Sequence, residues 1–304
     1  MGQLVNGKWI DQWYDTAATG GAFQRTTTSF RHQIGDADFP AQVGRYHLYV
    51  SYACPWAHRT LILRVLKQLE TVISVSAVEP LMLERGWTFG QADPLTGASA
   101  MYEVYLHADP AFTGRATVPI LWDKLTGRIV NNESAEIIRQ LNQAFDALTP
   151  VRQDFYPASL RAEIDSINAR VYDAINNGVY KAGFATAQGP YDAAVATLFA
   201  ALDWVEGLLG ARAWLAGDQL TEADIRLFTT IIRFDPVYHG HFKCNWRQAA
   251  SYPNLWRWVK SIYNLPGIAE TVDFAVIRQH YYGSHKTINP TGVVPRGPVM
   301  DLAG

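Results

Sequence analysis

The stretch 51–59 places one cysteine where an apolar strand is expected to turn into an amphipathic helix. The preceding segment, 46–50, is rich in β-branched and aromatic residues, which favours a strand. Downstream, apolar side chains recur at helical spacing at Ile62, Val65, Leu66 and Leu69. Pro55 suits the first helical position, because the N–H that proline lacks would have no partner there. The sequence thus predicts a strand, a tight turn and a helix around Cys54.

The predicted position of Cys54 is at or beside the helix N-cap, where free backbone N–H groups and the helix dipole stabilise an anion. We therefore expect a lowered thiol pKa and a large thiolate fraction near neutral pH, as a nucleophile requires. Alternatively, Cys54 is a buried small apolar residue, a common state of a free cysteine. A dithiol oxidoreductase has a second cysteine three residues on, but that position is Ala57. A mixed disulfide at Cys54 would then need an outside thiol to release it, which predicts a small-molecule thiol as co-substrate.

Composition limits the class of protein. With 304 residues and 48% hydrophobic content the chain can bury a full core, and its length suggests two domains. A net charge of −2 gives no basis for a nucleic-acid or acidic-membrane partner, and two distant cysteines favour a reducing compartment over a disulfide framework. The first ten residues lack the pattern of a signal peptide, and no stretch approaches the ~18 apolar residues of a membrane span. We therefore expect a soluble, cytoplasmic protein without a membrane partner.

The chain divides into four zones. Residues 1–38 carry several aromatic side chains and little periodicity, which predicts an arm packed on the body of the protein. Residues 39–150 alternate in the order of a thioredoxin-like α/β domain, with an insertion at about 80–115 expected to be mainly loop. Residues 151–275 predict an all-helical domain, and 276–304 a tail that is not helical throughout. The expected elements of the second zone are strand 46–51, helix 56–69, strands 72–78, 118–122 and 128–131, and helix 133–145.

Asp224 is an acid among apolar residues, and at first sight it suggests a functional role. It stands three residues after Thr221, in a pattern that resembles a capping box at a helix start. Capping accounts for Asp224 in full, so we expect a structural role.

Two further motifs lie in the thioredoxin-like zone. In the run 117–119, a cis peptide before Pro119 would turn the backbone of Val118 toward Cys54, and that backbone could pair with a peptide ligand. The alternative is an ordinary trans proline at a strand edge. At the start of the next helix, Glu133 and Ser134 are suited to an α-ammonium and an α-carboxylate group, respectively. Simple helix capping explains that pair equally well.

Taken together, these motifs resemble the glutathione transferases, and more specifically their xi class, the glutathionyl-hydroquinone reductases. The resemblance runs from about residue 20 to the end of the chain. It implies a thioredoxin-like α/β N-terminal domain followed by an all-α C-terminal domain, the glutathione transferase fold. The stretches that carry it are 45–49, 52–59, 86–87, 117–119, 130–134, 177–185, 221–228, 233–235, 242–245 and 289–292.

The resemblance implies a reaction in which Cys54 attacks the glutathione sulfur of a glutathionyl-hydroquinone. Free hydroquinone leaves, and a second glutathione resolves the mixed disulfide to give glutathione disulfide. Glutathione is then a co-substrate, no cofactor is bound permanently, and a homodimer is expected.

The resemblance also implies roles for individual residues. Tyr180 and Tyr281 are expected around the hydroquinone, with Tyr282 as the alternative to Tyr281; from the residues alone, half-buried amphipathic tyrosines would be the simpler interpretation. The residues implied to bind glutathione are Trp87, a loop residue forming a wall; Arg115 on the glycine carboxylate; Val118 through its backbone; and Glu133 with Ser134 on the γ-glutamyl end.

Other candidate groups are given smaller roles. His58 and Arg59 either stabilise the thiolate or face solvent, and Cys244 is expected to pack structurally. The histidine pairs 239/241 and 280/285 lack a third ligand, so we expect no metal.

Three functions therefore remain open: a glutathionyl-hydroquinone reductase, a broader thiol transferase or dehydroascorbate reductase of the omega type, and a non-enzymatic ligand-binding protein. The insertion at 80–115 and the tail with Tyr281 favour the first. A nucleophilic Cys54 argues against the third.

Overall fold

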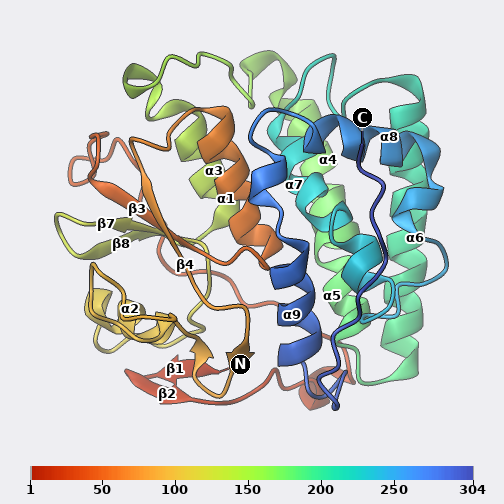
Figure 1. Cartoon of the computed structure of the whole chain (residues 1–304), viewed down its shortest axis with the longest axis horizontal. Helices are drawn as coiled ribbons and strands as arrows, with labels where there is room; N and C mark the ends of the chain where they lie inside the picture. Colours follow the sequence, from red (N-terminus) through yellow and green to blue (C-terminus); the bar gives the residue numbers. More distant parts are fainter. Residues whose placement is uncertain (1, 304) are drawn as a thin grey trace. The chain divides into compact units, whose positions relative to one another are not determined.

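The computed structural model describes residues 2–303 (Figure 1). These residues divide into two compact units of three chain stretches each. Unit 1 combines the residues up to Trp13 with Thr27–Gln153 and Ala275–Ser284. Unit 2 combines Tyr14–Thr26, Asp154–Phe274 and the residues from His285 on. The arm 1–38 and the tail 276–304 therefore each contribute to both units.

Unit 1 is built on a mixed four-stranded sheet in the order β4-β3-β7-β8. Strand β3 pairs in parallel with β4 and antiparallel with β7, which in turn pairs antiparallel with β8. Every residue of β3 is buried, which explains its continuous run of large side chains without polar alternation. The predicted thioredoxin-like order is confirmed. The strands span Tyr46–Val50 (β3), Ser74–Ala77 (β4), Ile120–Asp123 (β7) and Arg128–Asn131 (β8).

Two helices of unit 1, α1 (Pro55–Leu66) and α3 (Ser134–Gln143), pack side by side (Figure 1). Helix α1 ends three residues before the predicted position, because Gln68 adopts a left-handed φ of 50° and turns the chain away. Helix α9 (Phe274–Ser284) gives all but its first residue to the same unit.

The insertion at 80–115 is not mainly loop, so that prediction is wrong. It contains a short antiparallel pair, β5 (Met82–Leu83) with β6 (Gly86–Trp87), and helix α2 (Met101–Ala108). The buried side chains of α2 are Met101, Val104 and Tyr105, whose helical spacing covers too few turns to stand out among the polar residues around it. A second hairpin joins β1 (Gln3–Val5) to β2 (Lys8–Ile10).

Unit 2 is helical, as predicted. Its helix α6 packs along α5 and α8, and α4 packs on α7. The α-helices span Arg161–Val171 (α4), Gly178–Gly183 (α5), Gln188–Ala211 (α6), Glu222–Ile231 (α7) and Pro253–Tyr263 (α8). Wider π-helical turns occupy Tyr172–Asn176 and Phe234–Tyr238. Short 3₁₀ turns in the two units lie at Ala17–Thr19, Asp146–Leu148, Ala158–Leu160, Ala249–Ser251 and Ala269–Thr271.

Helix α6 corrects one expectation from composition. Its 24 residues include an 18-residue window of mean hydropathy 1.4, so by length and composition alone it is apolar enough to span a membrane. In the structure α6 is a packed helix of unit 2, and its buried face includes Leu198, Leu202 and Val205. Of this apolar window, 44% is buried inside the structure.

Asp224 caps α7. One of its carboxylate oxygens accepts hydrogen bonds from Leu215 N (2.8 Å) and Trp258 Nε1 (2.9 Å). The other accepts from Thr221 N (2.9 Å) and Thr221 Oγ1 (3.0 Å). The predicted structural role of Asp224 is confirmed.

Candidate active site

Cys54 is the N-cap residue of α1, with an extended backbone (φ −79°, ψ 119°) and Pro55 in the first turn after it. Its carbonyl oxygen accepts the first helical hydrogen bond from His58 N at 3.0 Å, and its own N–H donates to Ser51 O at 3.1 Å. The thiol is partly exposed. The turn thus presents the sulfur at the positive end of a helix, as the sequence predicted.

Val118 lies next to this thiol within unit 1. The Val118–Pro119 peptide is cis, and Cys54 Sγ lies 3.6 Å from the Val118 carbonyl oxygen. The backbone of Val118 therefore stands beside the reactive atom, in the position that a cis peptide was expected to give it. Its part in binding glutathione stays a prediction.

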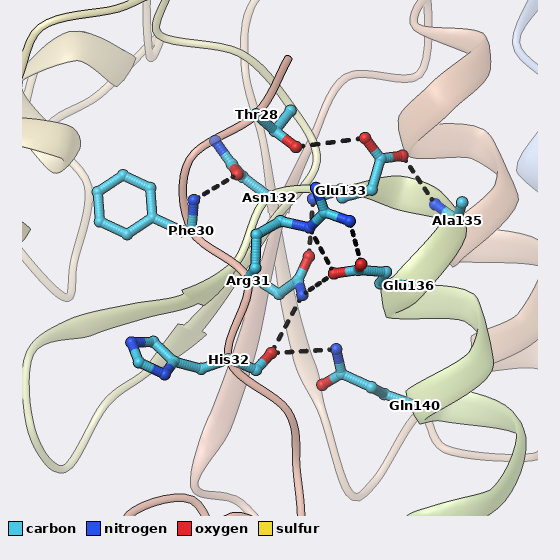
Figure 2. Close-up of polar contacts among 10 residues, drawn as sticks. Thr28, Phe30, Arg31, His32, Asn132, Glu133, Ala135, Glu136 and Gln140 are labelled. Atoms are coloured by element: carbon cyan, nitrogen blue, oxygen red, sulfur yellow. Dashed lines mark hydrogen bonds and ion pairs between the residues drawn. The ribbon is translucent and has the colours of Figure 1, made fainter.

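Glu133 is the N-cap residue of α3, and Ser134 begins that helix. One Glu133 oxygen accepts from Ala135 N (3.1 Å), and the other accepts from the Thr28 hydroxyl (3.3 Å; Figure 2). These two bonds fix the plane of the carboxylate and occupy two of its roughly four acceptor positions. Capping is thus observed, and it leaves acceptor capacity of the kind that an α-ammonium group would need.

The first turn of α1 contributes buried cationic and imidazole groups. His58 and Arg59 are 0% and 1% exposed, which rules out the alternative in which they face solvent. The reason is that α1 packs against α3, and this packing encloses its first turn. Arg59 Nη1 lies 3.4 Å from the Ser134 hydroxyl, and the guanidinium carbon lies 4.6 Å from the ring centroid of Trp56.

A strap formed by residues 28–34 of the arm fixes the start of α3 (Figure 2). His32 N donates to Val130 O (2.9 Å), Asn132 N donates to Phe30 O (3.1 Å), and the Arg31 guanidinium pairs with Glu136. The strap thereby covers the edge of β8, which would otherwise present unpaired backbone groups. Sequence reasoning missed this contribution, because Thr28 and Glu133 are 105 residues apart and no local pattern links them.

Trp87 lies in strand β6, so its predicted place in a loop is wrong. Its ring stacks on that of His280 from α9, with centroids 4.6 Å apart and planes 21° apart. His280 Nδ1 is 2.9 Å from Pro80 O, which joins α9 to the segment before the hairpin. Arg115 Nη1 contacts the carbonyl oxygens of Gly2 (3.3 Å) and Gln12 (3.4 Å). The glutathione contacts assigned to Trp87 and Arg115 stay predictions.

The candidate tyrosines belong to different units. Tyr281 lies on α9 within unit 1 and is 1% exposed, whereas the adjacent Tyr282 is partly exposed. Tyr180 lies on α5 within unit 2, buried among aromatic rings. Unit 1 thus contains Cys54, Trp87, Arg115, Val118, Glu133, Ser134 and Tyr281.

Cys244 differs from Cys54 in its burial. It is fully buried, and burial raises the pKa of its thiol far above the ordinary value. Over residues 2–303, no three His, Cys, Asp or Glu side chains are placed to hold a metal ion.

Comparison with known proteins agrees with this geometry. Models of the glutathione S-transferase N-terminal and C-terminal domains match residues 53–144 and 188–261. The chain is 56% identical to the glutathionyl-hydroquinone reductase YqjG of Escherichia coli, covering 99% of this chain and 97% of that protein. It is 54% identical to the glutathionyl-hydroquinone reductase PcpF of Sphingobium chlorophenolicum, covering 100% and 98%.

Solved structures give the same result. The xi glutathione transferase of Phanerochaete chrysosporium superposes with a TM-score of 0.91 at 52% identity, covering 94% of this chain and 95% of that one. The glutathione-bound structure of E. coli YqjG superposes with a TM-score of 0.88 at 54% identity, covering 99% and 97%. The chain therefore belongs to the glutathione S-transferase family, in which its relatives include xi-class enzymes and glutathionyl-hydroquinone reductases.

Proposed function

We propose that this protein is a glutathionyl-hydroquinone reductase that uses Cys54 as its nucleophile and glutathione as its co-substrate. The observation that carries the proposal is a partly exposed cysteine at the N-cap of α1, beside the Val118 carbonyl, with Ala57 where a resolving cysteine would stand. Full-length similarity to two reductases of this kind supports the choice of substrate.

The reaction proceeds in two steps, a reductive cleavage of the thioether and a thiol–disulfide exchange. The Cys54 thiolate attacks the glutathione sulfur, and the bond between that sulfur and the aromatic carbon breaks with its electron pair on the ring. The ring carbon takes up a proton, and free hydroquinone leaves a Cys54–glutathione disulfide. A second glutathione thiolate then attacks the glutathione sulfur of this disulfide, which releases glutathione disulfide and regenerates the Cys54 thiolate. The two-electron reduction of the ring carbon is balanced by oxidation of the two glutathione sulfurs to a disulfide, and Cys54 is regenerated unchanged.

Each implied residue has a part in this scheme. Val118 supplies backbone hydrogen bonds to glutathione, Arg115 takes its glycine carboxylate, and Trp87 forms a wall. Glu133 and Ser134 take the γ-glutamyl end at the start of α3, where helix N–H groups favour a carboxylate. Tyr180 and Tyr281 donate hydrogen bonds to the hydroquinone oxygens and so stabilise charge on the leaving ring.

The test is to mix glutathionyl-hydroquinone with excess glutathione and follow hydroquinone release, with Cys54→Ser as the matched variant. We expect release by the wild type and no release by the variant. Dehydroascorbate and a glutathionylated peptide serve as competing substrates in parallel reactions. Preferred turnover of either one would favour the broader omega-type function and contradict the proposal.

A second measurement isolates the covalent step. One equivalent of substrate without free glutathione should leave a single glutathione adduct on Cys54 and none on Cys244, as read by peptide mass spectrometry. An adduct-free enzyme that still releases hydroquinone would refute the mechanism.

The proposal extends to the setting of the enzyme. A reaction that consumes reduced glutathione and keeps Cys54 as a free thiol belongs in a reducing compartment, so we place the protein in the cytoplasm, where it would return conjugated quinones to free hydroquinones. We also propose a homodimer, which sedimentation equilibrium would test.

A further inference from the structure

Tyr180 stands in an aromatic pocket within unit 2. Its ring packs against Phe242, Phe184 and Tyr238, with centroids 5.5, 5.7 and 6.0 Å away. Only 8% of its surface is exposed. A charge that faces such a ring acts through less solvent than it would at an open surface, so its effect on the phenol is stronger.

Arg25, itself an exposed residue, brings such a charge from the arm, so solvent screens part of its effect on the buried phenol. Its guanidinium carbon lies 5.0 Å from the centroid of the Tyr180 ring and 5.6 Å from that of Phe23, both within the range of a cation–π contact. Its Nε also donates a hydrogen bond to Asn177 Oδ1 at 2.8 Å. Arg25, Asn177 and Tyr180 all belong to unit 2.

Asn177 explains why the guanidinium is held over this particular ring. Asn177 and Tyr180 are three residues apart at the start of α5, so their side chains share one face of the helix. A guanidinium that is hydrogen-bonded to Asn177 therefore lies over the Tyr180 ring. Asn177 is buried, which restricts its amide and fixes the position of the cation.

We propose that Arg25 is a positioning residue for the hydroquinone reaction and that it acts through Tyr180. Its positive charge over the ring stabilises the electron-rich form of the phenol, so Tyr180 becomes a stronger hydrogen-bond donor to the oxygen of the leaving hydroquinone. The inference rests on the proposed function, because it uses Tyr180 as the residue that contacts the hydroquinone.

Other ionisable groups lie around this pocket. Lys181, next in the chain, forms an ion pair with Asp173 at 2.6 Å, and Asp235 accepts from the backbone of Ala249 and Ala250. Further groups are Tyr238, at 6.0 Å between ring centroids; Tyr14, whose ring stacks on Phe184 at 6.3 Å; and the hydrogen-bonded pair His241 and His285, whose rings pack on Phe242. Arg25 is thus a cation that lies over the face of the Tyr180 ring.

The test measures the ionisation of Tyr180 directly in the free protein. Tyrosines are labelled with ¹³C at Cζ, the Tyr180 resonance is identified by its loss in Tyr180→Phe, and its pH titration is compared in three variants. Arg25→Gln removes the charge, and we expect the pKa of Tyr180 to rise by about half a unit. Arg25→Lys keeps the charge and should restore most of the wild-type value. Lys181→Gln is the matched control and should leave the titration unchanged.

Turnover is measured in parallel. We expect Arg25→Gln to lower kcat for glutathionyl-hydroquinone by about two- to threefold with little change in the KM for glutathione, and Arg25→Lys to recover the loss. An unchanged Tyr180 titration in Arg25→Gln overturns the inference, and so does a shifted titration with unchanged kcat. Failure of the proposed function is seen separately, as absence of hydroquinone release by the wild type, because the titration needs no substrate.

Discussion

The capping of α7 by Asp224 allows a quantitative prediction. Its two carboxylate oxygens each accept two hydrogen bonds, from Leu215 N and Trp258 Nε1 on one side and from Thr221 N and Thr221 Oγ1 on the other. Burial raises the pKa of this carboxyl, and the same donors oppose the rise. Asp224→Asn keeps the shape of the side chain but replaces one acceptor oxygen with an NH₂ donor.

The loss of stability in Asp224→Asn depends on which of these four hydrogen bonds the asparagine can form again. The asparagine oxygen can retain Leu215 N and Trp258 Nε1, and the Thr221 hydroxyl can rotate to accept from the new NH₂. The Thr221 N–H cannot change its role, so a buried backbone donor is left facing another donor. A buried donor without a partner costs about 1–3 kcal/mol, and the loss of charge from the remaining bonds adds to it. We therefore expect a destabilisation of about 2–4 kcal/mol.

The assay is thermal unfolding of the full chain, with Asp218→Asn as the control, because Asp218 is an exposed acid six residues upstream. For a body of roughly 150 residues, a change of this size lowers Tm by roughly 5–15 °C. The control should stay within about 0.5 kcal/mol of the wild type. A Tm for Asp224→Asn equal to that of the control would refute the capping argument.

Four further outcomes are expected. His47 is buried, and burial lowers its pKa to about 4. Between pH 6.5 and 4 the unfolded chain therefore binds a proton that the folded chain does not, so the free energy of unfolding should fall by about 3 kcal/mol as the pH drops through that window. His47→Gln should flatten the pH dependence of the urea midpoint. Iodoacetamide should alkylate Cys54 in the native protein and reach Cys244 only after denaturation; equal rates at the two thiols would contradict the difference in burial. Gly183→Ala places a Cβ 2.2 Å from Phe242 and should cost about 1–3 kcal/mol in chemical denaturation, whereas Gly189→Ala, with open space around it, should be neutral or slightly stabilising. Thr28→Val removes the hydroxyl that donates a hydrogen bond to the Glu133 carboxylate, and it should raise the KM for glutathione severalfold with kcat retained. Thr28→Ser should restore the wild-type KM. An unchanged KM in Thr28→Val would show that Thr28 takes no part in glutathione binding.

Local patterns predicted the parts of this protein that depend on neighbours in the sequence. The strand before Cys54, the helix after it and the cap at Asp224 each follow from a few consecutive residues with one period or one capping motif. The three-residue motif at Val118 left a cis and a trans peptide open, and Val118 lies beside the thiol as the cis alternative required.

The missed features depend on contacts between distant segments. Arg59 appears in the sequence as a charged residue in the first turn of a helix, and only the packing of α1 on α3 shows that it is buried beside Ser134. Thr28 and Arg25 belong to an arm without periodicity, and their partners Glu133 and Asn177 are more than 100 residues away. Helix α2 was missed because it is too short for its apolar spacing to exceed the surrounding polar background.

Each unit is built from three separate stretches of the chain, and this limits how recombination can exchange the units. A single break after Gln153 would leave the first fragment without the residues of α9, and so without the Ser284 hydroxyl that accepts from Met82 N and the imidazole that stacks on Trp87. The second fragment would lack Tyr14–Thr26 and with it Arg25. One recombination event between the halves therefore cannot transfer either unit whole.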